Sequence, residues 1–226
     1  MEEKNPKSVS IVPIGSTGLV RVGNSIEITN KIIQEHEERS ISENFNSVKI
    51  GNQFWMTKNL DVDCYLNGDS IPQVQNPKDW ENLKTGAWCY YNNDPENGTK
   101  YGKIYNWYAI NDKRGLAPKG YKVASFDDWK TLFEKLGENV AGYKLKSNHG
   151  WRENRNGNNE SKMNIYPAGF RCYNFFAGID EYTYFWTSTE KNEKSAVFVN
   201  FNYYADYVFS SDSFKYSGLY VRCLKI

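Results

Sequence analysis

The sequence predicts a mixed fold in which strands and short helices occupy separate stretches of the chain. Three observations predict it: apolar and polar residues alternate on both sides of Gly51 and Asn52, an amphipathic stretch follows Ser125, and alternating runs return near the C-terminus. Of the 226 residues, 39% are hydrophobic and 24% are charged, as in ordinary globular proteins. This composition excludes fibrous, collagen-like and wholly disordered chains.

The chain divides into two parts of different composition. Residues 1–44 contain no Phe, Trp or Tyr, and all 36 aromatic residues lie in 45–226. The first part shows strand-like stretches at 8–14 and 19–22 and a predicted helix over 26–39. So small a segment cannot bury a core of its own. We therefore expect it to dock on the main domain, on another copy of the chain or on a partner.

The main part begins with a predicted β-hairpin over 48–56, which turns at Gly51 and Asn52. Asn76 followed by Pro77 predicts the start of a short helix, because Asn caps helices well and Pro suits their first position. A second short helix is predicted over 101–110, where apolar residues recur at helical spacing.

The clearest helix signal follows Ser125. Ser125 and Asp128 form a capping-box-like start. The apolar positions that follow at helical spacing are Trp129, Leu132, Phe133 and Leu136. Gly137 is expected to end this amphipathic helix.

The second half of the main part reads as a long loop followed by strands. Residues 147–162 are dense in Asn and Gly, which predicts a long loop of the kind that is functional or mobile. Strands are expected over 196–203, 207–209 and 218–224.

Charge and hydropathy limit the partners. Lys and Arg number 28 and Asp and Glu 27, so the net charge of +1 gives no general reason to expect nucleic acid or an anionic membrane as partner. No run approaches the ~18 apolar residues of a spanning helix, so no membrane span is expected. The N-terminus is polar and encodes no signal peptide, which leaves a cytoplasmic or non-classically exported protein as one expectation.

The cysteines leave the redox state open. The four are Cys64, Cys89, Cys172 and Cys223. With no C-x-x-C pair and only two histidines, a structural zinc site is not expected. Two disulfides in any of three pairings, or four thiols, are compatible with the spacing, and buried thiols are the favoured expectation.

Six segments of the main part resemble those of one known family. They are QFWMTKNL (53–60), WCYYNND (88–94), YGKIYNWY (101–108), GLAPKG (115–120), FWTSTE (185–190) and YVRCL (220–224). In this order they resemble the Fibrobacter succinogenes major paralogous domain over about residues 45–226. That family is similar in turn to the C-type-lectin-like superfamily, which also holds the variable proteins of diversity-generating retroelements and the formylglycine-generating enzymes.

The resemblance implies a C-type-lectin-like fold. This is a compact α+β domain with two main helices, small antiparallel sheets and long irregular loops. Family members resemble exported proteins or lipoproteins of Bacteroidetes and Fibrobacteres that act in surface adhesion. The resemblance therefore points to a cell-surface or secreted protein. This differs from the expectation drawn from the polar N-terminus, which encodes no signal peptide.

Catalytic patterns are missing from the main part. Its only histidine is His149, so a Ser-His-Asp or Cys-His device is not expected, and the common nucleotide-binding and hydrolase motifs do not occur. We therefore expect no enzyme. The formylglycine-generating relatives use a reactive cysteine pair, for which Cys172 and Cys223 are the candidates here. Cys223 lies in an apolar strand, where an inert thiol or a disulfide is expected instead.

A structural calcium ion is one cofactor to consider, because lectin-like domains often hold calcium with carboxylate and amide oxygens. Asn158, Asn159 and Glu160, within NGNNE (156–160), are the main candidate ligands, and residues 92–94 are a second set. The alternative is that these amides cap loops through hydrogen bonds to their own backbone.

Residues 182–216 are the candidate binding region. They are rich in Tyr, Phe, Trp, Asn, Ser and Asp, a composition typical of antibody paratopes. In retroelement variable proteins the corresponding region carries the binding face. The side chains expected to contact a ligand are Trp186, Asn200, Asn202, Tyr204, Tyr207 and Tyr216, with Trp151 and Arg171 from the neighbouring loop.

The alternative is that strand alternation packs half of this region into the core. Val197, Val199 and Phe201 would then point inward, and Phe198, Asn200 and Asn202 outward.

Taken together, the sequence predicts a non-catalytic recognition or adhesion module that binds a protein or glycan ligand. A second hypothesis is a structural subunit of a surface or injection-type assembly, in which residues 1–44 dock on a neighbouring chain or a second copy. A formylglycine-type oxidase is the third.

Overall fold

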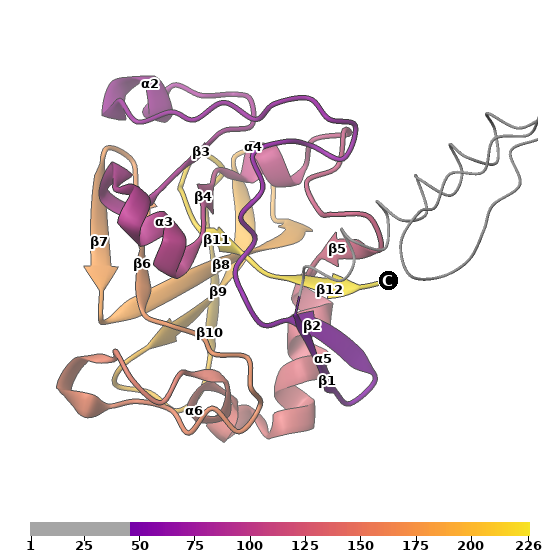
Figure 1. The fold of residues 1–226 in the computed structure, drawn as a ribbon, viewed down its shortest axis with the longest axis vertical. Coiled ribbons are helices and arrows are strands. Elements are labelled where there is room, and N and C mark those ends of the chain that lie inside the picture. Colours follow the sequence, from indigo (N-terminus) through magenta and orange to yellow (C-terminus); the bar gives the residue numbers. More distant parts are fainter. Residues whose placement is uncertain (1–45) are drawn as a thin grey trace, which may run out of the picture. The chain divides into compact units, whose positions relative to one another are not determined.

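The computed structural model describes residues 46–226, which build three β-sheets with short helices around them (Figure 1). Most of the regular structure is strand, and the mixed α+β class is confirmed. The elements expected at 8–14, 19–22 and 26–39, and the docking role of residues 1–44, lie outside the described residues.

The first sheet joins the beginning of the domain to its end. Its strands, in order, are β1 (Ser47–Ile50), β2 (Gln53–Met56), β12 (Cys223–Lys225) and β5 (Tyr121–Val123). All neighbours are antiparallel, and Leu224 of β12 lies opposite Trp55 of β2. The expected hairpin over 48–56 is confirmed, with Gly51 in its turn at a φ of 60° that only glycine adopts easily.

The second sheet is built mainly from the C-terminal half. Its strands, in order, are β10 (Phe209–Phe214), β9 (Ser195–Asn202), β8 (Tyr182–Glu190), β6 (Ala168–Cys172) and β7 (Phe175–Ile179), and β11 (Tyr220–Val221) pairs with β8 in parallel. The strand expected over 196–203 is confirmed as β9, and the one expected over 207–209 begins only at Phe209. The single strand expected over 218–224 is instead two short strands, β11 in this sheet and β12 in the first. A third, two-stranded sheet pairs β3 (Trp88–Cys89) with β4 (Ile104–Tyr105).

The helices are short. They are α2 (Pro77–Glu81), α3 (Pro95–Tyr101), α4 (Trp107–Ile110), α5 (Phe126–Leu136) and α6 (Ala141–Leu145), with 3₁₀ turns at Tyr91–Asn93, Glu138–Val140 and Arg152–Asn154. The expected start of α2 is confirmed, because the Asn76 side chain accepts the backbone N–H groups of Lys78 and Asp79. Within residues 46–226, no helix has the length and apolar character needed to cross a membrane.

The helix predicted over 101–110 is wrong. Tyr101 ends α3, and Gly102 follows at a φ of 78°, a conformation that stops a helix. The chain then forms β4 before Asn106 starts α4 by accepting the backbone N–H of Ala109. The apolar residues at helical spacing thus belong to two helices and a strand.

Helix α5 is confirmed together with both of its end signals. The Ser125 side chain accepts the backbone N–H of Asp128, the Asp128 carboxylate accepts the backbone N–H of Ser125, and Gly137 follows the last turn. The helix lies beside the β1–β2 hairpin (Figure 1). At 11 residues it is the longest described helix.

Trp129 of α5 lies where the first and second sheets meet. Its ring centroid is 4.6 Å from that of Trp55 on β2, 5.6 Å from Phe185 on β8 and 6.1 Å from Phe201 on β9. All four rings are completely buried. This helix therefore carries the residue that packs the two larger sheets into one core.

Removing the cap of α5 tests how much its start contributes to stability. Ser125→Ala deletes the hydroxyl that accepts the N–H of Asp128 at 3.1 Å. We expect the free energy of unfolding, measured by urea denaturation, to fall by about 1 kcal/mol. Ser210→Ala, at an exposed position of β10, is the control and should change it by less than about 0.5 kcal/mol. Equal stability of the two variants would contradict the role of the cap.

Candidate functional site

Eight aromatic rings form one chain of contacts: five lie on strands of the second sheet, and Tyr203, Tyr204 and Tyr207 lie in the loop between β9 and β10. Tyr184, Asn200 and Phe209 lie opposite one another in the register of β8, β9 and β10, so their side chains point to the same face. We call this group the aromatic face; its members are Phe170, Tyr182, Tyr184, Phe198, Tyr203, Tyr204, Tyr207 and Phe209.

The aromatic face is continuous and ends in solvent. Neighbouring ring centroids lie 4.5 to 6.3 Å apart, the range in which aromatic pairs attract each other. Tyr204 is 53% exposed and Tyr207 is 47% exposed. Both contact Phe209, and the other rings are half-buried. The expected exposure of Tyr204 and Tyr207 is therefore confirmed.

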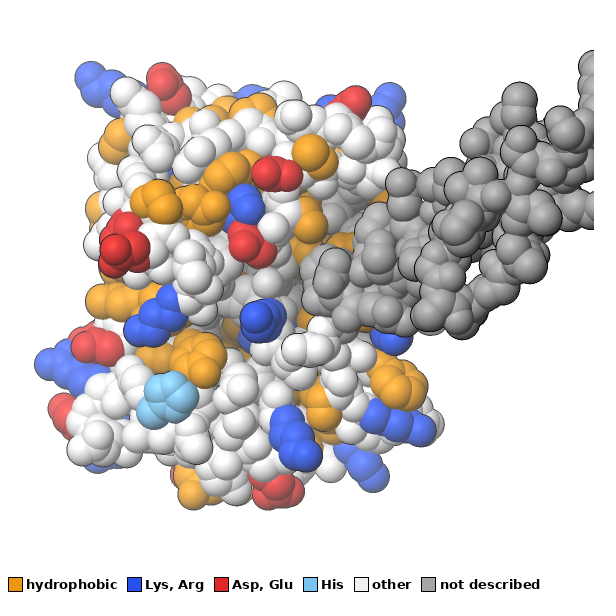
Figure 2. Space-filling view, in the orientation of Figure 1, with side chains coloured by type: hydrophobic (Ala, Val, Ile, Leu, Met, Phe, Trp, Pro, Cys, Tyr) orange, Lys and Arg blue, Asp and Glu red, His pale blue; other side chains and the backbone are white. Residues whose placement is uncertain are grey.

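Two tyrosine hydroxyls of this face, those of Tyr182 and Tyr184, have raised pKa values. Burial raises the pKa of Tyr184 to about 12 and also raises the pKa of Tyr182. On the side of the molecule shown in Figure 2, Lys and Arg side chains are interspersed with Asp and Glu, without a large field of one sign. Beside the rings and hydroxyl groups, the aromatic face has one neighbouring cation, Arg152, whose guanidinium carbon lies 5.9 Å from the Tyr203 ring centre.

The expected exposure of two tryptophans is wrong. Trp186 is completely buried, and its indole N–H donates to the carbonyl oxygen of Tyr105 at 3.1 Å. Trp151 is 3% exposed, and its indole N–H donates to the Ser147 hydroxyl at 3.1 Å. A buried indole needs such an acceptor, and both rings are part of the core.

The expected exposure of Asn200, Asn202 and Arg171 is also wrong. Both asparagines lie on β9, an inner strand of the second sheet that is covered on both faces, and Asn202 is completely buried. Asn200 lies opposite Tyr184 and Phe209 in the register, and it is only 7% exposed, so the expected outward orientation to solvent is not found. Arg171 is completely buried; it donates to the carbonyl oxygen of Val74 and stacks on Trp80 at 4.2 Å.

Tyr216 lies outside the aromatic face. It is half-buried and stacks on Phe214, with centroids 5.2 Å apart and planes 12° from parallel. Tyr173 completes this smaller group at 5.1 Å from Tyr216. Desolvation raises the pKa of Tyr216 well above its usual range.

The candidate calcium ligands are engaged within their own loop. The Asn158 side chain accepts the backbone N–H of Glu160, and Asn159 exchanges two hydrogen bonds with Asn164. Glu160 lies 3.4 Å from the ammonium group of Lys144. This is the arrangement that the loop-capping alternative predicts. Over the described range 46–226, no three His, Cys, Asp or Glu side chains gather as metal ligands would.

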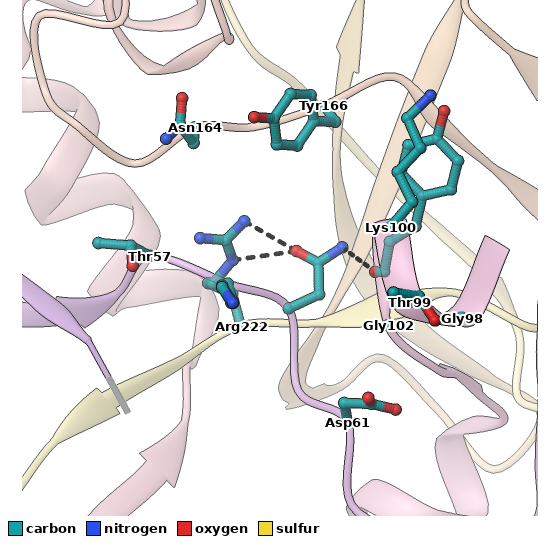
Figure 3. A pocket seen from close by; sticks show the side chains of 12 residues that line it. Thr57, Asp61, Gly98, Thr99, Lys100, Gly102, Asn164, Tyr166 and Arg222 are labelled. Atoms are coloured by element: carbon teal, nitrogen blue, oxygen red, sulfur yellow. Dashed lines mark hydrogen bonds between the residues drawn. The ribbon is translucent and has the colours of Figure 1, made fainter. Parts of the chain in front are cut away.

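A cavity of about 300 Å³ lies elsewhere, where four segments meet (Figure 3). The first lining segment is 57–61, which follows β2, and the second is 98–102, the last turn of α3 and the glycine after it. Asn164 and Tyr166, which precede β6, and Arg222, which lies between β11 and β12, complete the lining. Sequence reasoning missed this site.

Arg222 is the unusual residue of this cavity, because its side chain is a cation that is only 2% exposed. It donates to the carbonyl oxygens of Met56 at 2.8 Å and Met163 at 3.0 Å. Its Nε and Nη2 atoms both donate to the Asn59 side-chain oxygen, at 3.1 and 2.8 Å. Burial lowers the pKa of Arg222 to about 9, which leaves it charged at pH 7. A charged residue inside the apolar run YVRCL was the available sequence signal.

Comparison with known families decides the relationship. Residues 48–225 match the Fibrobacter succinogenes major domain. The chain belongs to this family. No curated protein and no solved structure gives a significant match.

Three of the segments that resemble the family meet at the cavity of this Fibrobacter succinogenes major domain. The first contributes Thr57 and Asn59, the third Tyr101 and Gly102, and the last Arg222. The Asn59 amide also donates to the carbonyl oxygen of Tyr101 at 2.8 Å, so hydrogen bonds through Asn59 connect all three segments (Figure 3).

The cysteines of the domain differ in access. All four are free thiols; Cys64 is exposed, Cys172 is half-buried, and Cys89 and Cys223 are buried. Burial raises the pKa of Cys89 to about 11 and that of Cys223 to about 12. Buried thiols are thus confirmed for these two, whereas Cys64 lies at the surface.

Thiol labelling tests this order of access. At pH 8 we expect Ellman's reagent to modify Cys64 rapidly and Cys172 more slowly, and to reach Cys89 and Cys223 only after denaturation, because thiolate and access are both needed. Cys64→Ser should remove the rapid phase of labelling, and this loss would assign the rapid phase to Cys64. Rapid modification of Cys223 in the folded protein would contradict its burial.

Proposed function

We propose that this domain is a non-catalytic recognition module that binds a protein or glycan ligand through its aromatic face. The observation that carries the proposal is the exposure of Tyr204 and Tyr207 at the edge of a continuous group of rings. Tyrosine offers a wide contact area with few rotatable bonds, which keeps the entropic cost of binding low.

The chemistry of this face fits a ligand that presents apolar patches and hydroxyl groups. Ring faces accommodate the C–H surfaces of sugars or aliphatic side chains, and phenol hydroxyls supply directed hydrogen bonds. Asn200 and Asn202 are buried, so the exposed polar neighbours Asp206 and Ser211 take the place of those amides.

We also propose that the domain is a variant of the C-type-lectin-like fold. Its small antiparallel sheets and the long stretch between α6 and β6, which carries one 3₁₀ turn, support this. Its two longest described helices are α5, with 11 residues, and α3, with seven.

The oxidase alternative receives no support from the cysteines. Its candidate pair includes Cys223, which is completely buried with a raised pKa. A nucleophilic cysteine needs the opposite, an accessible thiol with a lowered pKa.

An array of plant and bacterial glycans and candidate proteins, probed with and without calcium, tests the recognition proposal. We expect Tyr204→Ala/Tyr207→Ala to weaken binding at least about 30-fold, because the loss of about 2 kcal/mol at one aromatic contact alone has that effect. Trp186 is left intact because its ring is completely buried.

The matched control is Phe54→Ala/Phe175→Ala, which removes two rings of similar exposure, 40% and 52%, outside the aromatic face. It should bind as the wild type does. Binding lost equally in both double variants, or no binding at all, would refute the proposal. If Tyr204→Ala/Tyr207→Ala instead abolished only self-association, measured by light scattering, the assembly-subunit hypothesis would replace it.

A further inference from the structure

The charge of Arg222 has no anionic partner in the described part of the chain. A guanidinium group has five N–H donors. Four are used, by Met56, Met163 and twice by Asn59, and every one of these acceptors is neutral. One N–H of Nη2 remains. A buried cation without a counter-charge is costly unless something compensates it.

The other charges around the cavity are also mostly positive. Lys58 and Lys100 are exposed residues that line it. The one carboxylate of the lining is Asp61, which already pairs with Lys103 at 2.6 Å. The cavity therefore combines a buried cation with two exposed ones, and a bound anion would be attracted by all three.

Neutral donors lie across the cavity from Arg222. Figure 3 shows Asn164 and Tyr166 on the opposite side of the open space from the guanidinium group. The Asn164 side-chain oxygen accepts a hydrogen bond from the Asn159 side chain at 2.7 Å. The NH₂ group of Asn164 therefore points away from Asn159. Within residues 46–226 no hydrogen bond holds the Tyr166 hydroxyl, and the Tyr166 ring lies 5.2 Å from that of His149.

The arrangement is held in place before any ligand arrives. Asn59 receives two hydrogen bonds from Arg222 and donates one to the Tyr101 carbonyl, which fixes the guanidinium plane. Such preorganisation lowers the cost of binding. The volume of about 300 Å³ is at the lower end of the range for small-molecule sites.

We propose that this cavity binds a small molecule bearing an oxyanion, with Arg222 as the buried cation and Lys58 and Lys100 at the entrance. A carboxylate on a sugar acid and a phosphate group share this chemistry. None of the lining residues belongs to the aromatic face, so this proposal and the recognition proposal fail independently.

Thermal unfolding of the full chain tests the site with four probes at matched ionic strength: galacturonate, galactose, inorganic phosphate and sodium chloride. We expect galacturonate or phosphate to raise Tm by about 3 °C or more at ten times its Kd. Galactose, which has the shape of galacturonate without its charge, should not raise it. The larger of the two anion shifts identifies carboxylate or phosphate as the preferred group.

Two variants of residues that line the cavity, chosen because they should leave the fold intact, test whether the anion binds there. Lys58→Ala/Lys100→Ala should weaken the active anion about fivefold to tenfold, and Tyr166→Phe about fivefold, both measured by calorimetry. Both should retain the Tm of the wild type without ligand to within a few degrees. Lys78→Ala/Lys191→Ala and Tyr143→Phe are the matched controls, because these side chains are exposed and do not line the cavity.

Three results would overturn the proposal. They are no shift with either anion beyond that of sodium chloride, an equal shift with galactose, and equal affinity in the cavity variants and their controls. Retention of the anion shift in Tyr204→Ala/Tyr207→Ala is expected whether or not the aromatic face binds a ligand.

Discussion

Arg222 donates hydrogen bonds to Met56, Asn59 and Met163 from a position that is only 2% exposed. It lies between β11, which pairs with β8 of the second sheet, and β12, which pairs with β2 and β5 of the first. The last strands therefore change sheets at this residue. A buried charge tolerates little displacement from its acceptors, so the angle at which the chain passes from one sheet to the other is fixed there.

Ring packing and hydrogen bonds both stabilise the region where the first and second sheets meet. Trp129 brings α5 against Trp55 of the first sheet and Phe185 and Phe201 of the second, through rings alone. Arg222 lies where the chain passes between the same two sheets; it donates to Met56 of β2, to Asn59 in the loop after β2 and to Met163 in the loop before β6, and its guanidinium carbon lies 5.5 Å from the Phe185 ring centre. Rings supply most of the burial, and the hydrogen bonds select one relative arrangement.

Local signals were predictable from the sequence, and tertiary burial was not. The capping box at Ser125 is complete within four residues, and α5 followed from it. Gly102 was an equally local stop signal, which the apolar spacing over 101–110 concealed. The burial of Trp186 and Asn200 depends on which strands become central in the sheet and on what covers them, information that is spread over the whole chain. Only the charged residue inside YVRCL hinted at the Arg222 site.

The pairing of β12 with β2 has a consequence for biosynthesis. Leu224 lies opposite Trp55, so the first sheet needs residues from both extremes of the domain. While residues 223–225 are still inside the ribosomal exit tunnel, β2 and β5 lack the strand that lies between them. The emerging chain thus exposes unpaired strand edges and apolar rings until translation has passed this point, and such long-range closure is slow.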